Sequence, residues 1–150
     1  MKSTLQFRAA LLAAALTTSL AGTAAFAQVP LPSVQRSGPI EYVSGGISTE
    51  ESQAFLAAAA HWPLALEFGV DGGGGPRAQY AADVQVAIRD SAGRPVLQTR
   101  STGPYLLVKL PPGRYAVDAT FGGRVMAHSI EVREGQPTKH SFIWPASVAG

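Results

Sequence analysis

The chain has 150 residues, with 12 Lys and Arg, 10 Asp and Glu, 16 Gly, 11 Pro and no Cys. This length indicates one domain, and the absence of cysteine excludes disulfides, thiolate metal sites and cysteine nucleophiles. Hydrophobic residues make up 46% of the chain and charged residues 15%, a balance that excludes a disordered polyelectrolyte.

The first 27 residues have the pattern of a secretory signal peptide. Lys2 and Arg8 form a basic start, residues 9–16 are an unbroken apolar run, and Ala25-Phe26-Ala27 is a small-x-small cleavage site. We therefore expect cleavage after Ala27, in a bacterial pattern, and a periplasmic or secreted product. An uncleaved anchor is the alternative, but the apolar run is shorter than the roughly 20 residues that a membrane span needs.

Removal of residues 1–27 takes away two basic residues and leaves 10 basic against 10 acidic. The basic excess that is typical of nucleic-acid-binding proteins is then lost. We expect no nucleic-acid partner, and no stable membrane anchor after cleavage.

After the cleavage site, residues 28–46 are rich in Pro and Gly and predict an extended leader. The sequence from Ser48 to Ala60 predicts the only helix, with Ser48 and Glu51 in the spacing of a capping box. Pro63 ends it. Residues 28–62 are thus expected to precede a β-sandwich domain at 63–150.

From Pro63 onward the apolar residues alternate with period two, which predicts strands. Short, closely spaced strands of this kind indicate an all-β, antiparallel sandwich. Asp90–Gly93 predicts a three-residue hairpin loop, and Pro112-Gly113 a type II turn. The seven expected strands are residues 64–70, 84–89, 95–100, 105–110, 114–121, 124–133 and 137–144.

Two turns predict how the last three strands pair. A two-residue turn at Gly122-Gly123 pairs Val117 with His128, and a three-residue link at 134–136 pairs His128 with Phe142 in an antiparallel hairpin. Both registers place the same side chains on one buried face. These are Tyr115, Val117, Ala119, Met126, His128, Ile130, Val132, Phe142 and Trp144.

The stretch from Gly103 to Gly123 resembles the carboxypeptidase regulatory-like domain. Leu110, Pro112, Gly113 and Tyr115 match its Leu-x-Pro-Gly-x-Tyr pattern, and the sequence from Val84 to Gly93 is similar to its strand-and-turn motif. The resemblance covers about residues 63–144 and implies a prealbumin-like (transthyretin-like) sandwich of about seven strands. It also implies an accessory, adhesive or scaffolding module without catalytic residues.

His128 and His140 are the only pair of candidate metal ligands that the expected register brings together. A zinc site needs three or four ligands, and no carboxylate falls on the same strand face. We therefore interpret both histidines as packed side chains of the core, and we expect no metal site.

Other motifs favour structural roles. No serine lies in a G-x-S-x-G elbow, and Glu50-Glu51 suit the start of a helix better than acid–base chemistry. The glycines of 72–75 lack the Gly-Lys-Ser/Thr ending of a phosphate loop and predict a hairpin loop. Trp62, at the junction of the helix and the first expected strand, is expected to plug one end of the sandwich.

These patterns predict an exported, non-enzymatic β-sandwich module that binds or scaffolds in the periplasm. Its partner is an unidentified protein or cell-envelope component, and no cofactor is expected. Two alternatives remain: a small-ligand carrier, which aromatic residues gathered at an open sandwich end would favour, and a periplasmic metal-binding protein or hydrolase using His128 and His140, which a third ligand would favour.

Overall fold

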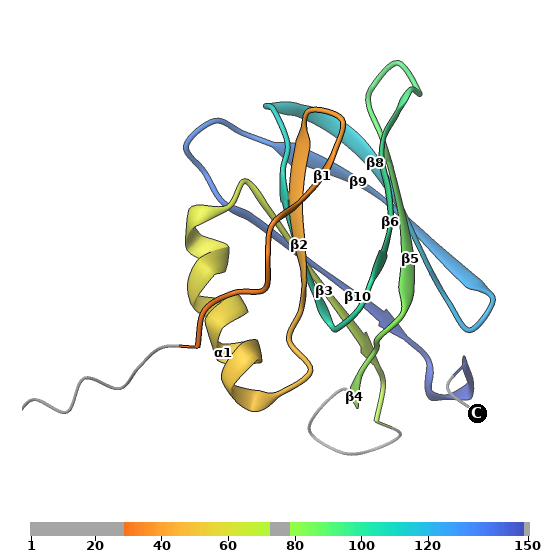
Figure 1. Cartoon of the computed structure of the whole chain (residues 1–150). Coiled ribbons are helices and arrows are strands. Elements are labelled where there is room, and N and C mark those ends of the chain that lie inside the picture. Colours follow the sequence, from red (N-terminus) through yellow and green to blue (C-terminus); the bar gives the residue numbers. More distant parts are fainter. Residues whose placement is uncertain (1–28, 73–78, 149–150) are drawn as a thin grey trace, which may run out of the picture.

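The computed structural model describes residues 29–72 and 79–148, which form two packed sheets and one short helix (Figure 1). The expectation of an all-β sandwich is confirmed. Residues 1–28, which include the expected signal peptide, lie outside the described ranges, as does most of the glycine loop. Within the described ranges, no helix has the length and apolar character of a membrane span.

Sheet A holds six of the ten strands and sheet B holds four. The strands of sheet A run in the order β1-β2-β7-β3-β10, with β4 paired to the end of β3; they are β1 (Gln35–Ser37), β2 (Ile40–Gly45), β3 (Leu64–Val70), β4 (Gln79–Tyr80), β7 (Tyr105–Lys109) and β10 (Thr138–Trp144). Sheet B runs β6-β5-β8-β9, with β5 (Val84–Arg89), β6 (Pro95–Ser101), β8 (Gly113–Phe121) and β9 (Arg124–Val132).

The leader expectation differs from the structure, because part of that segment belongs to the sandwich. β1 and β2 form a hairpin, and β2 pairs antiparallel with β7 along Glu41 to Gly45. Ile40 and Val43 are buried on opposite faces of the sheet. The prolines and glycines that suggested a leader lie around the strands and in their turn, where Gly38 has a φ of 56°.

The expected register of β8 and β9 is confirmed over nine residue pairs. Gly122 and Gly123 both have positive φ, at 56° and 75°, which a two-residue hairpin turn with right-handed twist requires. The Asp90–Gly93 loop is also confirmed: Gly93 N donates to Asp90 O at 2.9 Å, and the Asp90 carboxylate accepts from Ala92 N and Arg94 N.

The expected pairing of β9 with β10 is wrong. β10 lies parallel to β3 in the other sheet, so the sandwich is mixed rather than purely antiparallel. Pro137 has no N–H to continue a ladder with β9, and Thr138 N donates to Pro63 O at 3.0 Å, which starts the pairing with β3. The chain therefore crosses between sheets at 133–137, and Phe142 stacks on Phe68 with ring centroids 5.9 Å apart.

The predicted buried face is nevertheless found between the sheets, because β10 faces the same core from the opposite sheet. Seven of its nine residues are buried there, and Met126 and His128 are partly buried. The large side chains that fill the centre of this core include Leu64, Leu66, Phe68, Ile88, Leu97, Leu106, Phe142 and Trp144.

The helix α1 (Thr49–Ala58) and a following 3-10 turn, η1 (Ala59–His61), cover the outer face of sheet A, opposite sheet B (Figure 1). The Ser48 half of the capping box is confirmed, because Glu51 N donates to Ser48 Oγ at 3.1 Å. The Glu51 carboxylate accepts from Ile47 N at 3.2 Å, one residue before the N-cap N–H that a full capping box uses. Phe55 is fully buried and stacks on Tyr105. A ten-residue helix is marginal alone, so this second core holds it in place.

Pro112-Gly113 is not the type II turn that the sequence predicted. Gly113 has a φ of 158°, far from the value near +80° of that turn, and it already belongs to β8. The corner is held instead by Tyr115, whose hydroxyl donates to Pro111 O at 2.6 Å.

Candidate functional site

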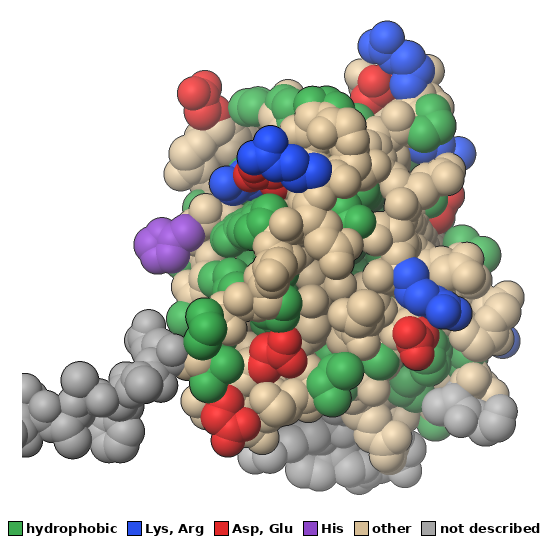
Figure 2. All heavy atoms as spheres, viewed as in Figure 1, with side chains coloured by type: hydrophobic (Ala, Val, Ile, Leu, Met, Phe, Trp, Pro, Cys, Tyr) green, Lys and Arg blue, Asp and Glu red, His purple; other side chains and the backbone are tan. Residues whose placement is uncertain are grey.

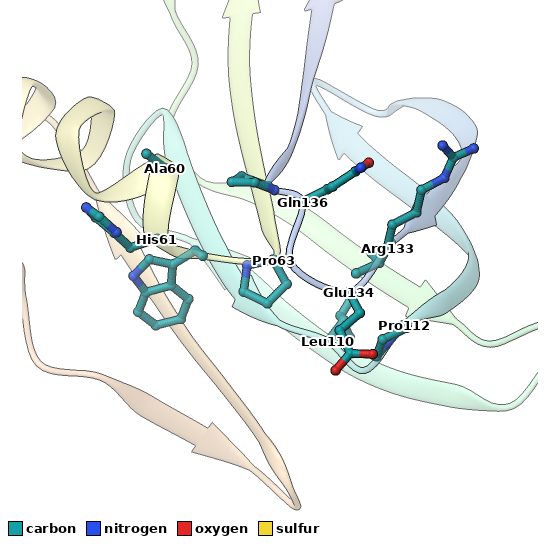
Figure 3. A pocket seen from close by; sticks show the side chains of 12 residues that line it. Ala60, His61, Pro63, Leu110, Pro112, Arg133, Glu134 and Gln136 are labelled. Atoms are coloured by element: carbon teal, nitrogen blue, oxygen red, sulfur yellow. The ribbon is translucent and has the colours of Figure 1, made fainter.

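A cavity of about 300 Å³ lies at one end of the sandwich, where three connections meet (Figure 3). They are the link from η1 to β3, the corner from β7 to β8, and the crossover from β9 to β10. Each carries a proline, Pro63, Pro112 or Pro137, because each is the place where a strand begins or ends. We call this cavity the end pocket.

Buried apolar side chains form the floor of the end pocket. Trp62, Leu110 and Val132 line it and are at most 8% exposed. Trp62 belongs to the core beneath α1, on the outer face of sheet A, and not to the core between the sheets, so it lines this end of the molecule without plugging the sandwich. Lys109 Nζ lies 5.2 Å from the centre of the Trp62 ring.

The rim of the end pocket is polar. His61, Arg133, Glu134 and Gln136 are exposed there, and Figure 3 shows the Arg133 guanidinium pointing away from Leu110 and Pro63. A shallower hollow adjoins the end pocket and shares His61, Pro63 and Leu110 with it. An apolar floor with a polar rim, at the lower end of the size range of ligand sites, can hold an apolar group and orient the polar atoms around it.

A surface ion pair lies beside this hollow. Lys109 Nζ and Glu41 are 3.0 Å apart, and Arg36 reaches the same carboxylate at 2.6 Å. The hydrogen bond from Lys109 and its positive charge hold the pKa of Glu41 below its usual value. Glu41 therefore stays ionised, and its carboxylate forms ion pairs with Lys109 and Arg36.

His128 and His140 come together, although their strands belong to different sheets. Their ring centroids are 4.7 Å apart, and each ring lies edge-on to Phe142 at 5.0 Å. The Nε2 atom of His140 is buried with no hydrogen-bond partner. Burial, and secondarily the neighbouring His128, hold the pKa of His140 below its usual value.

No third ligand accompanies the two histidines. Among residues 29–72 and 79–148, no three His, Asp or Glu side chains are placed to hold one metal ion. Two imidazoles alone leave a zinc ion short of the three or four protein ligands that such sites use.

The other residues that the sequence singled out as candidates for a functional site have structural roles. Glu51 caps α1, and of the glycine loop only Gly72 lies in the described ranges. Besides Arg36, four of the basic residues on the strands form ion pairs with acids, as in Arg89–Asp118 at 2.8 Å; the other three are Arg100, Lys109 and Arg133. Figure 2 shows acidic side chains beside basic ones in the upper and right parts of the face drawn, and acidic side chains without a basic neighbour at its lower left.

The end pocket itself was not found from the sequence. Leu110, Pro112 and 134–136 were recognised only as strand ends and turns, because the pocket depends on the crossover of β10 into sheet A. The contact between Tyr80, which is exposed, and Tyr105, which is buried, was not predicted either. Their hydroxyl oxygens are 3.3 Å apart. Tyr80 lies on β4, whose two residues are too few to show an alternating pattern.

Comparison with models of protein families and with curated proteins finds no match to this chain.

Proposed function

We propose that this chain is an exported, non-enzymatic β-sandwich module that binds a partner in the periplasm through its end pocket. The observation that carries the proposal is the pocket itself: an apolar floor of Trp62, Leu110 and Val132 with a rim of exposed polar side chains. Export rests on the signal-peptide pattern of residues 1–27.

The partner that fits best is an extended segment of a cell-envelope protein. The pocket continues into a shallow hollow lined by Pro39, Ile40 and Pro111, so the combined surface is an open groove rather than an enclosed cavity. Such a groove suits a peptide with one or two apolar anchors, whose backbone is free to bond with Gln136 and His61 at the rim.

The family proposed is the carboxypeptidase regulatory-like one. The Tyr115–Pro111 hydrogen bond gives a structural reason for the Pro-Gly-x-Tyr pattern that carries the resemblance. This hydrogen bond fixes the corner between β7 and β8 beside the end pocket, which agrees with a binding role for the pocket.

A small-ligand carrier is the second candidate function. The volume of about 300 Å³ favours it, since it would hold a compact molecule. Of the described residues that line the pocket, Trp62 is the only Phe, Trp or Tyr, whereas a gathering of aromatics was the feature that would have favoured a carrier.

Site-specific photo-crosslinking in intact cells tests the binding proposal. A benzophenone amino acid at Gln136, on the rim, is compared with the same group at Gln98, an exposed glutamine on the outer face of sheet B. We expect a discrete adduct of higher mass from position 136 and none from position 98. Equal labelling from both positions, or none from 136, would contradict binding through the end pocket.

A further inference from the structure

One side of the sandwich is closed without a backbone ladder between its two edge strands. β9 is the edge of sheet B and β10 the edge of sheet A; β9 pairs only with β8, and β10 only with β3. In the part of the chain that the structure describes, the one backbone bridge on this side is between Arg133 and Gln136, in the connection itself. We call the β9–β10 side of the sandwich the seam.

Two hydrogen bonds cross the seam, one toward each end. Trp144 Nε1 donates to Arg124 O at 3.0 Å, and Thr138 Oγ donates to Glu131 O at 3.3 Å. Between them His128 on β9 contacts His140 on β10. The pair is therefore the central contact of the side on which the two sheets are not joined by a ladder.

The surroundings of His128 and His140 in the seam favour uncharged imidazole rings. Both rings pack edge-on against Phe142, and the buried Nε2 of His140 meets neither solvent nor an acceptor. A proton on that atom would be a buried donor without a partner, which is costly. A proton on each ring would place two positive charges in direct contact.

Among residues 29–72 and 79–148, no acidic group lies on the inner faces of the sheets beside the pair to offset such a charge. On the inward faces of the strands packed around it, β3 and β10 contribute no other titratable side chain, β8 contributes Tyr115, and β9 contributes Arg124, at its exposed start. Glu67 and Lys139 line a small cavity that reaches His140 from the other face of sheet A. Glu131 alternates outward on β9.

We propose that the seam is a pH-sensitive latch, closed while the contact between His128 and His140 is uncharged and loosened when His140 takes up a proton. The unfolded chain binds this proton more readily than the folded one, because the buried Nε2 of His140 has no partner and the His128 ring adjoins it. Stability from the contact is therefore fully present above the ordinary histidine pKa, about 6.5, and is lost as the pH falls below it. Loosening would expose Phe142 and Trp144 on the edge strand β10.

The two tryptophans allow the seam to be observed directly. Trp62 and Trp144 are the only ones in the chain, and Trp144 is fully buried with its indole in one of the seam hydrogen bonds. In a Trp62→Phe background, acrylamide quenching of Trp144 is measured from about pH 7.5 to about pH 5, above the range in which ordinary carboxylates titrate. We expect quenching to rise at least about twofold and Tm to fall by roughly 4–8 °C.

Two double variants carry the test in that background. His128→Phe with His140→Phe keeps an aromatic pair that cannot be charged, and His128→Gln with His140→Gln keeps polar groups. Either one, if folded at about pH 7.5, should lose most of the acid-dependent change in quenching and in Tm. His61→Gln removes the remaining histidine, which is exposed beside the end pocket, and should leave both changes intact.

A measurement on the unmodified protein decides the case even if both double variants fail to fold. The titration of the His140 imidazole is followed by NMR. A midpoint at or above about 6.5 would overturn the proposal, because such a group does not withhold protons in the folded state. An acid-dependent change in Trp144 that persists in a folded double variant would overturn it as well.

Discussion

Tyr115 shows how one side chain holds a corner of this fold. Its ring is buried in the core between the sheets, while its hydroxyl donates to Pro111 O, four residues back along the chain. Burial raises the pKa of the Tyr115 hydroxyl, so it stays protonated and keeps its role as a donor. The bond ties the end of β7 to the start of β8, next to the end pocket.

Removal of that hydroxyl should destabilise the fold without opening a cavity. We expect Tyr115→Phe to lower the free energy of unfolding by about 0.5–1.5 kcal/mol, the usual net value of one such hydrogen bond. Urea denaturation measures the loss. Tyr42→Phe is the matched control, since Tyr42 is partly buried against the same core and the described residues offer its hydroxyl no hydrogen bond. Equal losses in the two variants would show that the Tyr115 bond adds nothing specific.

The elements of sheet A approach one another closely at two glycines. A Cβ built on Gly103, just before β7, would collide with the carbonyl of Gly45 at the end of β2. Both glycines are buried, so the contact is between two backbones that have little freedom to separate. Glycine at 103 is therefore needed for close approach.

A pair of glycine variants separates close approach from backbone conformation. Gly103→Ala should cost at least about 1 kcal/mol more than Gly38→Ala, because overpacking against backbone typically costs about 1–3 kcal/mol. Gly38 is the control because it has a φ of 56° but open space around its Cβ position, so alanine there meets only conformational strain. Chemical denaturation compares the two; a Gly103→Ala variant as stable as Gly38→Ala would mean that β2 and β7 are less tightly packed than the structure describes.

At the scale of the whole molecule, local patterns and short hairpins could be predicted from the sequence, whereas pairing between distant segments could not. Alternation predicted seven strands, and Gly122-Gly123 predicted the β8–β9 register, because a two-residue turn leaves no other pairing. β10 was assigned to the wrong sheet, since nothing local to 134–144 indicates pairing with β3, about 70 residues earlier. The burial of Phe142 was still predicted correctly, because both pairings leave it facing the same core.

The candidate site shows the same difference between local patterns, which could be predicted, and contacts between distant segments, which could not. The contact between His128 and His140 was anticipated through a hairpin that does not form, and it arises instead across the seam. The end pocket could not be anticipated, since it requires the helix, the Tyr115 corner and the crossover to meet at one end. β1 and β2 were missed because a short strand beside Pro and Gly has too little alternation to be recognised.

The proposed export predicts where the mature chain begins. We expect the protein isolated from the periplasm to begin at Gln28, with the sequence Gln-Val-Pro-Leu, because cleavage follows the small-x-small site at Ala27. N-terminal sequencing, or the intact mass, measures this. A mature protein that retains Met1, or one found only in the cytoplasm, would contradict it.

The most direct test of the proposed binding is to block the end pocket and measure how much crosslinked adduct still forms. Ala60 lines the rim and is exposed, so Ala60→Trp should fill the entrance without disturbing the core. Ala127→Trp, at an exposed position on β9, is the matched control. In cells that carry the benzophenone at Gln136, we predict that Ala60→Trp removes at least about 90% of the crosslinked adduct, a tenfold loss that corresponds to about 1.4 kcal/mol of binding free energy. The adduct should persist with Ala127→Trp, and its survival at full yield in Ala60→Trp would contradict binding through the end pocket.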